Sequence, residues 1–290
     1  MKILVLGSKG QLGQCLNDQL KNTDHNVVYA SREQIDIADF IATANQILKV
    51  SPEVVINATA FTAVDKAEED QERADLVNHL AVANIAHICN QLGCWLIHVS
   101  TDYVFDGDSD VAYKEADRTN PQGIYGETKL KGELVIQSSG RKHIIIRTAW
   151  VFSEYGNNFL KAMLRLGSER DEISVVNDQI GCPTYAQDIA RAIVEIVPQL
   201  NSQKYYGVYH YCGAKPCSWY GFAKAIFDHA KSNNLKVPST INSIDTLAYP
   251  TLAKRPAFSV LDCSKIEKDF GVLTSNWDAG IIQVISKLNV

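Results

Sequence analysis

Tyr125 and Lys129 stand four residues apart in the stretch IYGETKLKGE, residues 124–133. On a helix, residues with this spacing share one face, so a phenol and an ammonium group would point the same way. A free tyrosine has a pKa of about 10, and a nearby ammonium is expected to lower it by stabilising the phenolate. The pair could therefore be a general acid with its tuning group, although exposed helices also contain this spacing by chance.

Two hydroxyl side chains precede this pair by about two dozen residues. Ser100 and Thr101 lie in HVSTDYVFDG, residues 98–107, where an apolar run over residues 94–101 predicts a buried strand. Ligands of open α/β sheets bind beyond the carboxyl ends of the strands. Either hydroxyl is therefore placed to donate a hydrogen bond to a substrate oxygen, and the four residues together predict a catalytic group.

A glycine loop follows the first apolar run of the chain. Gly7, Gly10 and Gly13 form the spacing G-x-x-G-x-x-G directly after KILVL, residues 2–6, and LGQCLNDQL at residues 12–20 has helical spacing. Glycines allow the backbone to turn tightly beside a pyrophosphate, and the helix N-terminus offers N–H groups to it. This context predicts a dinucleotide cofactor, whose nicotinamide ribose Lys129 could bind.

The end of the second predicted strand bears on which cofactor binds. The sequence has Ser31 and Arg32 there, where an acidic residue would favour NAD and an arginine favours the 2′-phosphate of NADP. NADPH is therefore preferred, and the adjacent Glu33 leaves NADH possible. Asp36 and Ile37 are placed to flank the adenine.

The third predicted strand ends in small residues. Ala58 and Ala60 follow Asn57 in INATA, residues 56–60. Side chains of this size leave room for a cofactor beside the backbone. Asn57 could equally be no more than a cap at the strand end.

The elements that must position these residues alternate along the first half of the chain. Short Val- and Ile-rich runs predict buried strands, and the segments between them have helical spacing. The predicted strands cover residues 2–6, 26–31, 53–59, 94–101 and 142–152, and the predicted helices cover 12–20, 38–50, 75–93 and the segment around Tyr125. Continuous apolar strands separated by helices indicate a doubly wound parallel α/β sheet of the Rossmann type.

The pattern loosens after residue 152. Helices are predicted over 156–166, 186–197, 218–231 and 278–289, strands over 173–178 and 207–213, and loops over 233–262. We interpret residues 1–152 as the NADP-binding domain, with a return of the chain to it at about 185–213. Residues 153–184 and 214–290 are then a smaller C-terminal substrate-binding domain over the carboxyl ends of the strands.

Composition excludes several classes of function. The 290 residues carry a net charge of −5, so the chain lacks the excess of positive charge that is typical of proteins that bind nucleic acid or an anionic membrane. The apolar run at the N-terminus is too short for a signal peptide or a membrane span. The seven cysteines are odd in number and contain no C-x-x-C, so reduced thiols in the cytoplasm are expected. Cys212 and Cys217 have no second pair nearby, so no metal site is predicted there.

Motifs over almost the whole chain carry a family resemblance. They are GQLG (10–13), NATAFTAVDKAE (57–68), STDYVFDG (100–107), YGETKLKGE (125–133), RTAWVF (147–152), GNNF (156–159), NDQIGCPT (177–184) and RP (255–256). In this order they resemble the extended short-chain dehydrogenase/reductases and, among these, the dTDP-4-dehydrorhamnose reductase family. The resemblance implies an NADPH-dependent oxidoreductase that reduces the C4 ketone of dTDP-4-dehydro-L-rhamnose, the last step of dTDP-rhamnose biosynthesis.

The same resemblance implies roles for single residues. Thr101 would hydrogen-bond the carbonyl oxygen, Tyr125 would deliver the proton, and Lys129 would orient the ribose and tune Tyr125. Residues expected to contact the cofactor are Gly10, Gln11, Leu12, Ala60, Phe61 and Thr62. Residues expected to contact the nucleotide-sugar substrate, besides Thr101, are Asp102, Trp150, Asn158 and Arg255.

One departure from the family pattern concerns a metal. Some members have an acidic residue two positions after the third loop glycine and use it in a magnesium-bridged dimer, and this chain has Cys15 there. No metal is therefore predicted, magnesium at a dimer interface is left open, and the chain is expected to be a monomer or a homodimer.

Two other functions fit the same motifs. The chain could reduce another 4-keto-6-deoxy nucleotide sugar, because the motifs specify 4-ketoreduction better than the stereochemistry at C4. It could also be a non-catalytic NADP-binding regulatory subunit of methionine adenosyltransferase, since such subunits can keep Thr101, Tyr125 and Lys129.

Overall fold

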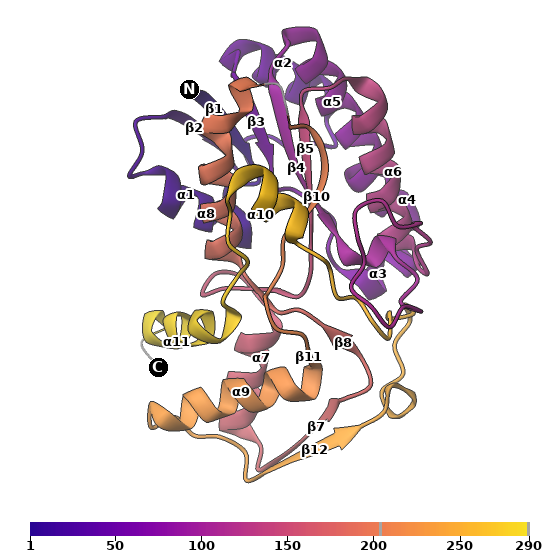
Figure 1. Cartoon of the computed structure of the whole chain (residues 1–290), viewed down its shortest axis with the longest axis vertical. Coiled ribbons are helices and arrows are strands. Elements are labelled where there is room, and N and C mark those ends of the chain that lie inside the picture. Colours follow the sequence, from indigo (N-terminus) through magenta and orange to yellow (C-terminus); the bar gives the residue numbers. More distant parts are fainter. Residues whose placement is uncertain (203–204, 289–290) are drawn as a thin grey trace.

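A parallel six-stranded sheet forms the centre of the upper part of the molecule in the computed structural model, which describes residues 1–202 and 205–288 (Figure 1). The strand order is β10-β5-β4-β3-β1-β2. Their bounds are β1 Lys2–Leu6, β2 Asn26–Ala30, β3 Val54–Asn57, β4 Trp95–Thr101, β5 His143–Thr148 and β10 Gly207–His210. The chain moves outward from β1 to β2 and then returns past β1 to β3, so the sheet is doubly wound and its direction switches beside β1.

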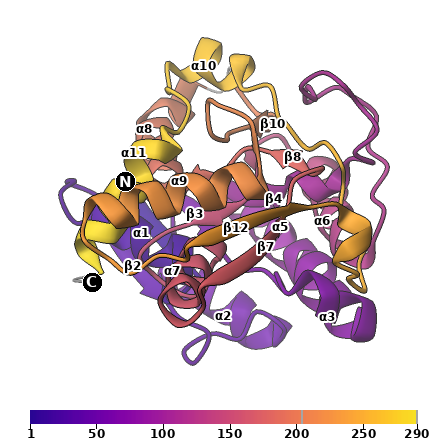
Figure 2. The ribbon, with the colours of Figure 1, turned by 90° about the horizontal axis from the view of Figure 1, so that it is seen from below.

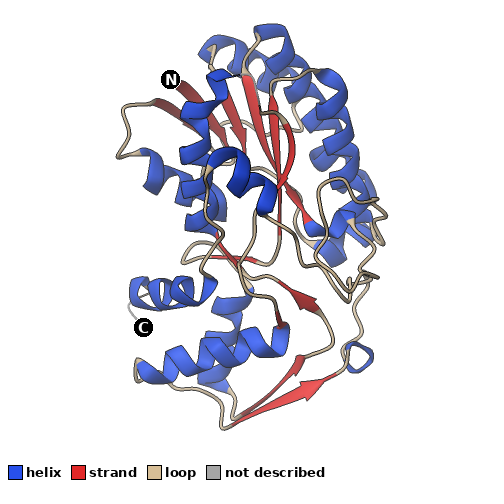
Figure 3. Cartoon of the chain, viewed as in Figure 1, coloured by secondary structure: helices blue, strands red, loops and turns tan. Residues whose placement is uncertain are grey.

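Helices cover both faces of this sheet because both faces of its strands are apolar. In β1, Ile3 and Val5 enter one core cluster with helices α1, α8 and α10, whereas Leu4 and Leu6 enter another with α2, α5 and α6. The helices on the first face are α1 Gln11–Leu20, α8 Ala186–Ile196 and α10 Ser264–Phe270. Those on the second face are α2 Phe40–Val50, α5 Ala81–Leu92 and α6 Ile124–Ser139. Figure 3 shows the strands in red between these helices in blue.

A smaller core lies below the carboxyl ends of the strands. It is built from α7 Phe159–Glu169, α9 Trp219–Ser232, α11 Trp277–Lys287 and the parallel pair β7 Glu172–Val176 with β12 Thr240–Ile244. Seen from below, α9 and the β7–β12 pair lie across the main sheet (Figure 2). Short strand pairs connect this part, namely β6 Val151–Phe152 with β9 Thr184–Tyr185 and β8 Ile180–Gly181 with β11 Cys217–Ser218.

Short helical segments complete the chain. They are α3 Val64–Glu69, α4 Gln71–Asp75, the π-turn η1 Leu76–Leu80, and the 3₁₀ turns η2 Asp102–Val104, η3 Val197–Ser202 and η4 Thr246–Ala248. The helix predicted over residues 75–93 is therefore interrupted at its start by η1. Within the described residues, no helix combines the length and apolar character needed to cross a membrane.

The structure confirms the doubly wound sheet and corrects several predicted elements. The strand predicted over residues 142–152 is two strands, because Trp150 has a φ of 46° and turns the chain between β5 and β6. The segment predicted as loops contains β12, which pairs with β7 at long range. Helix α10 was not predicted. The last helix ends at Lys287, and its predicted end at residue 289 lies outside the described residues.

The chain returns to the main sheet twice after residue 152. Strand β10 pairs with β5, and α8 packs on α1, within the predicted return at about 185–213. Residues from Val260 to Val272, including α10, also pack in the core of the main sheet, a return that was not predicted. The domain boundaries at 152, 184 and 214 stay a prediction.

Candidate active site

A cavity of about 540 Å³ lies at the carboxyl ends of the strands. Its walls come from the loops after β1, β3, β4 and β5, from α6 and from the start of α9. The lining residues are Gly10, Gln11, Leu12, Ala58, Thr59, Ala60, Thr62, Val64, Val99, Ser100, Thr101, Asp102, Tyr103, Tyr125, Lys129, Thr148, Trp150, Val151, Gly156, Asn157, Asn158, Ile189, Trp219 and Arg255. The fold thus brings the glycine loop, the hydroxyl pair and the Tyr–Lys pair to one place, as the motifs predict.

The glycine loop makes a tight turn into α1 in which two backbone segments approach closely. Gly7 has a φ of 81°, and a Cβ on Gly13 would lie 2.1 Å from the carbonyl oxygen of Gly7. Helix α1 begins at Gln11 with Gly10 as an N-cap that supplies no side-chain hydrogen bond, and its first turn has no acidic residue. Its first N–H groups therefore face the cavity without a side-chain acceptor, where the helix dipole favours an anion.

The loop after β3 is held by a residue that was not predicted. Asn78 of η1 accepts from the backbone N–H of Phe61 at 2.8 Å and donates to the carbonyl of Phe61 at 3.1 Å and to Thr128 of α6 at 3.2 Å. Ala58, Ala60 and Thr62 line the cavity, whereas Phe61 packs against the α2–α5 core. Asn78 thereby ties the cofactor-side loop to the helix that carries Tyr125.

The residues after β2 lie outside this cavity. Ser31 donates to Glu33 at 2.6 Å, and Lys9 pairs with the same carboxylate at 3.2 Å. The exposed guanidinium of Arg32 lies 3.7 Å from Asp36.

Asp36 also pairs with Arg73, at 3.3 Å, and lines a shallow hollow together with Phe40 and Ile41. Ile37 is buried in the α2–α5 core, so its side chain is not presented to a ligand at the surface.

The hydroxyl of Thr101 connects Tyr125 to Asp102. Thr101 donates to Asp102 at 3.0 Å, accepts from the N–H of Tyr103 at 3.2 Å, and hydrogen-bonds the Tyr125 phenol. Burial raises the pKa of Asp102 to about 6, against hydrogen bonds from Ser259 and Thr101 that lower it. Burial also raises the pKa of Tyr125, against the hydrogen bond with Thr101.

The expectation that Lys129 lowers the pKa of Tyr125 is therefore wrong for this structure. The Nζ atom of Lys129 lies 2.6 Å from the carbonyl oxygen of Val99 and 3.1 Å from Nε2 of His98, both on β4. Burial lowers the pKa of Lys129 to about 8, and Glu133 one turn along α6 acts against this shift. The pKa of the phenol is therefore set mainly by desolvation, and the charges of Asp102 and Tyr103 act in the same direction.

Three buried polar atoms point to a polar ligand in the cavity. Among the described residues, Oγ of Ser100, Oδ2 of Asp102 and Oγ1 of Thr148 are buried without a hydrogen-bond partner. An unpaired buried polar group costs roughly 1–3 kcal/mol, and these three residues all line the cavity. Together with the glycine loop they fit a dinucleotide cofactor and a substrate rich in hydroxyls.

Two tryptophans form the far wall. Trp150 stacks on Trp219 with ring centroids 3.5 Å apart and an angle of 6° between the planes. Gly181 makes room for this stack, because a Cβ there would lie 2.5 Å from the Trp150 ring. Trp219 was not predicted, and the only signal in the sequence is its place directly after the N-cap Ser218.

Two other predicted substrate residues also hold the walls together. Arg255 pairs with Asp65 of α3 at 2.6 Å and donates to the hydroxyl of Tyr103 of η2 at 3.0 Å. These two contacts hold residues 250–256 against α3 and η2. Asn158 caps α7 and donates to Oε1 of Gln11 at 2.8 Å, which joins α7 to the glycine loop.

Cys15 lies on the buried side of α1, in the core of the main sheet, rather than at a ligand-binding surface. It is fully buried, and burial raises its pKa, with Glu154 and Asp18 adding to the shift. Glu154 is itself paired with Lys287 at 2.5 Å. Over residues 1–202 and 205–288 no group of three His, Cys, Asp or Glu side chains is arranged to hold a metal ion.

Comparisons with known proteins agree with this geometry. The family model described as the RmlD substrate binding domain matches residues 1–290. A dTDP-4-dehydrorhamnose reductase of Aggregatibacter actinomycetemcomitans is 42% identical over 97% of this chain and 97% of its own length. A crystal structure of a dTDP-4-dehydrorhamnose reductase from Clostridium acetobutylicum has a TM-score of 0.93 and 37% identity, covering 100% of both chains. A Bacillus anthracis dTDP-4-dehydrorhamnose reductase in complex with NADP has a TM-score of 0.90 and 34% identity, covering 99% of both chains.

Proposed function

Because the chain belongs to the RmlD substrate binding domain family of dTDP-4-dehydrorhamnose reductases, we propose that it reduces the C4 ketone of dTDP-4-dehydro-L-rhamnose with NADPH and forms dTDP-L-rhamnose. The observation that carries the proposal is the hydrogen-bonded series Tyr125–Thr101–Asp102 in a cavity shared with the glycine loop. A ketone needs a proton donor and a hydride source side by side, and the cavity that Tyr125 shares with the glycine loop supports this pairing.

Tyr125, Thr101 and Lys129 have different roles in the proposed reduction. When bound, NADPH supplies the hydride that adds to C4. Tyr125 gives its phenolic proton to the ketone oxygen as the new hydroxyl forms, and Thr101 would turn its single hydroxyl proton from Asp102 to that oxygen to hold it in place. Lys129 lines the same cavity, and its ammonium would hold the nicotinamide ribose in place.

The remaining walls would recognise the nucleotide sugar. Asp102 has an unpaired carboxylate oxygen for a sugar hydroxyl, and the stacked rings of Trp150 and Trp219 would supply an apolar wall beside the pyranose. Arg255 would contact the nucleotide part of the substrate while keeping its contact with Tyr103, and Asn158 would also contact the substrate while keeping its contact with Gln11. We place Gly7, Gly10, Gln11, Leu12, Gly13, Ser31, Arg32, Asp36, Ile37, Ala58, Ala60, Phe61 and Thr62 on the cofactor side, with Ile37 as a packing residue behind it.

We further propose a cytoplasmic enzyme that works as a monomer or a homodimer and needs neither nucleic acid nor a membrane. Its seven cysteines are all free thiols, as a reducing compartment maintains them. Its net charge of −5 disfavours phosphate backbones and anionic lipids.

Transfer of an isotope tests the reaction directly. With NADPH that carries deuterium on the transferred position, the dTDP-L-rhamnose formed is expected to carry deuterium at C4, measured by NMR. Product formed without deuterium at C4 would contradict direct hydride transfer to that carbon.

The pH profile of kcat/KM is expected to have an acidic limb and a basic limb, one on each side of a maximum. The pKa of Asp102 is raised to about 6, so its carboxylate is present only above that pH, and the pKa of Lys129 is lowered to about 8, so its charge is lost above that pH. We therefore expect kcat/KM to be highest between these values and to fall on both sides. A kcat/KM that stays flat through both values in a buffer series would contradict these assignments.

The cofactor preference is expected to depend on Arg32. Its exposed guanidinium pairs only weakly with Asp36, at 3.7 Å, and is free to bind the 2′-phosphate of NADPH. Arg32→Ala should weaken NADPH binding about tenfold or more, the size of a lost charged hydrogen bond, and leave NADH binding almost unchanged in titration calorimetry. Arg165→Ala, an exposed arginine on α7, is the matched control. An equal loss for both cofactors would remove Arg32 from the phosphate.

A further inference from the structure

His98 is a buried histidine that directly contacts a proposed catalytic residue. It lies on β4, has no exposed surface, and both ring nitrogens have a polar neighbour. Nδ1 is 3.1 Å from the Nδ2 atom of Asn57 on β3, and Nε2 is 3.1 Å from the Nζ atom of Lys129 on α6. The ring therefore joins the end of β3 to the middle of α6.

The orientation of the Asn57 amide follows from its other neighbour. Its Oδ1 atom accepts from the backbone N–H of Thr59 at 3.1 Å and from the Thr59 hydroxyl at 2.5 Å. A backbone N–H can only donate, so the amide oxygen faces Thr59 and the NH₂ group faces His98. An NH₂ group has no acceptor, so Nδ1 of His98 must supply the lone pair.

The tautomer of His98 is fixed by this contact. Burial, followed by the charge of Lys129, lowers the pKa of His98 well below its usual value, so the ring is neutral. A neutral ring that accepts at Nδ1 carries its proton on Nε2. That N–H points at Nζ of Lys129. An ammonium group has only donors, so two N–H donors would then face each other with no acceptor between them.

We propose that His98 is a positioning residue for Lys129, whose Nε2–H donates to the Nζ atom and thereby favours the neutral amine over the ammonium. The inference deepens the proposed function and rests on it. A lysine that titrates close to the working pH can release and regain a proton during turnover, which a lysine charged at all times cannot do.

Burial acts in the same direction as the His98 contact, whereas the Val99 carbonyl, 2.6 Å from Nζ, and the carboxylate of Glu133 favour the ammonium. Glu133, from the same helix, favours the ammonium but is paired with Arg147 of β5 at 2.6 Å. Asp75 of α4 faces the outer side of α6 and pairs with Lys131 at 3.6 Å. Tyr103 of η2 packs edge-on against Tyr125, with ring centroids 5.5 Å apart.

The first test reads the tautomer in the unaltered protein. The spectrum is a long-range ¹H–¹⁵N correlation at neutral pH, in which the ring signals of His98 are assigned by connecting them to its backbone signals. Nε2 of His98 should carry a proton, and Nδ1 should carry none. A ring protonated on Nδ1, or on both nitrogens, would overturn the proposal. This measurement needs no turnover. The tautomer of His98 can therefore prove to be different while the proposed reductase activity stands, and the activity can be absent while the tautomer is as expected.

The second test asks whether His98 controls the titration of Lys129. His98→Gln removes the directed N–H and allows an amide oxygen to accept from the ammonium, so the basic limb of kcat/KM should move up by roughly one pH unit. A purely structural role would lower kcat/KM at every pH without moving that limb, and this result would overturn the proposal.

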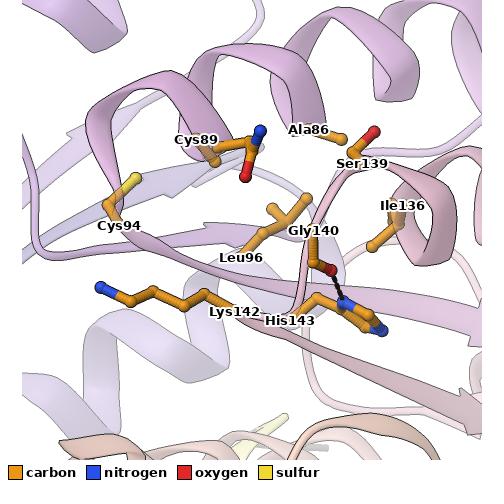
Figure 4. Close-up of a pocket in the computed structure, with 10 residues that line it drawn as sticks. Ala86, Cys89, Cys94, Leu96, Ile136, Ser139, Gly140, Lys142 and His143 are labelled. Carbon is orange, nitrogen blue, oxygen red and sulfur yellow. Dashed lines mark hydrogen bonds between the residues drawn. The ribbon is translucent and has the colours of Figure 1, made fainter. Parts of the chain in front are cut away.

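His143 supplies the matched control. It is also a buried histidine at a strand of the same sheet, but it lies at the opposite, amino end and binds the carbonyl of Gly140 at 2.7 Å (Figure 4). The small cavity around it, of about 20 Å³, is lined by Cys89, Cys94 and Lys142 among others and is separate from the active site. His143→Gln should leave the basic limb in place; a shift equal to that of His98→Gln would overturn the proposal.

Discussion

Replacing Tyr125 with phenylalanine is expected to lower kcat by roughly 10²–10⁴ and to leave NADPH affinity nearly unchanged. The phenol is the hydroxyl that Thr101 aligns at the cavity, and the substitution removes its proton while the ring keeps its edge-on contact with Tyr103. The measurement is steady-state kinetics with the 4-keto sugar together with calorimetric titration of NADPH. Turnover within a few-fold of the unaltered enzyme would remove Tyr125 from its proposed role.

Tyr103 allows a graded comparison at the same cavity wall. Its hydroxyl accepts from Arg255 at 3.0 Å instead of contacting Thr101. Tyr103→Phe removes the hydroxyl that accepts from Arg255, so Arg255 should be held less firmly and KM should rise. The change in kcat should be much smaller than for Tyr125→Phe. Equal losses in kcat for the two variants would mean that a general disturbance of the wall, rather than proton transfer, explains both.

Replacing Glu133 with glutamine is expected to destabilise the fold by roughly 3–5 kcal/mol. Glu133 has no exposed surface, and the guanidinium of Arg147 reaches both of its carboxylate oxygens, at 3.0 and 3.1 Å from Nε and 2.6 Å from Nη2. The neutral amide would leave a buried arginine uncompensated between α6 and β5. Chemical denaturation followed by circular dichroism measures the change in the free energy of unfolding.

An exposed ion pair on α7 supplies the control. Arg165 and Glu169 lie 3.1 Å apart at i,i+4 with both side chains at least half exposed. Glu169→Gln should therefore change stability by about 0.5 kcal/mol or less. If Glu133→Gln cost no more than this control, the Arg147 pair would not hold the catalytic helix on the sheet.

The architecture of the sheet could be predicted because its signals are local. The strands of the main sheet are continuous apolar runs, and Gly7, Gly10 and Gly13 stand where a tight turn must join the first strand to the first helix. Trp150 shows where local reasoning stops. Trp150 has a positive φ, and its ring fills the space that Gly181 leaves 31 residues later in the chain, so the pattern within RTAWVF does not predict the break.

The electrostatics of the site could not be predicted from spacing alone. The i,i+4 rule brings Tyr125 and Lys129 to the same face of α6, and both line the cavity. Which partner the ammonium faces depends on β4, which supplies His98 and the Val99 carbonyl, and on how completely α6 is buried. Asn78 and Trp219 were missed for the same reason, because each acts through residues far away in the sequence.

A coupled turnover assay shows directly whether the protein reduces the 4-keto sugar. The 4-keto-L-sugar is generated from dTDP-glucose by the dehydratase and the epimerase, the protein and NADPH are added, and absorbance at the nicotinamide band is followed, with the product identified by NMR. Rapid oxidation of NADPH with formation of dTDP-L-rhamnose is expected. NADPH that binds but is not oxidised would contradict this expectation, as would a product with the talose configuration at C4.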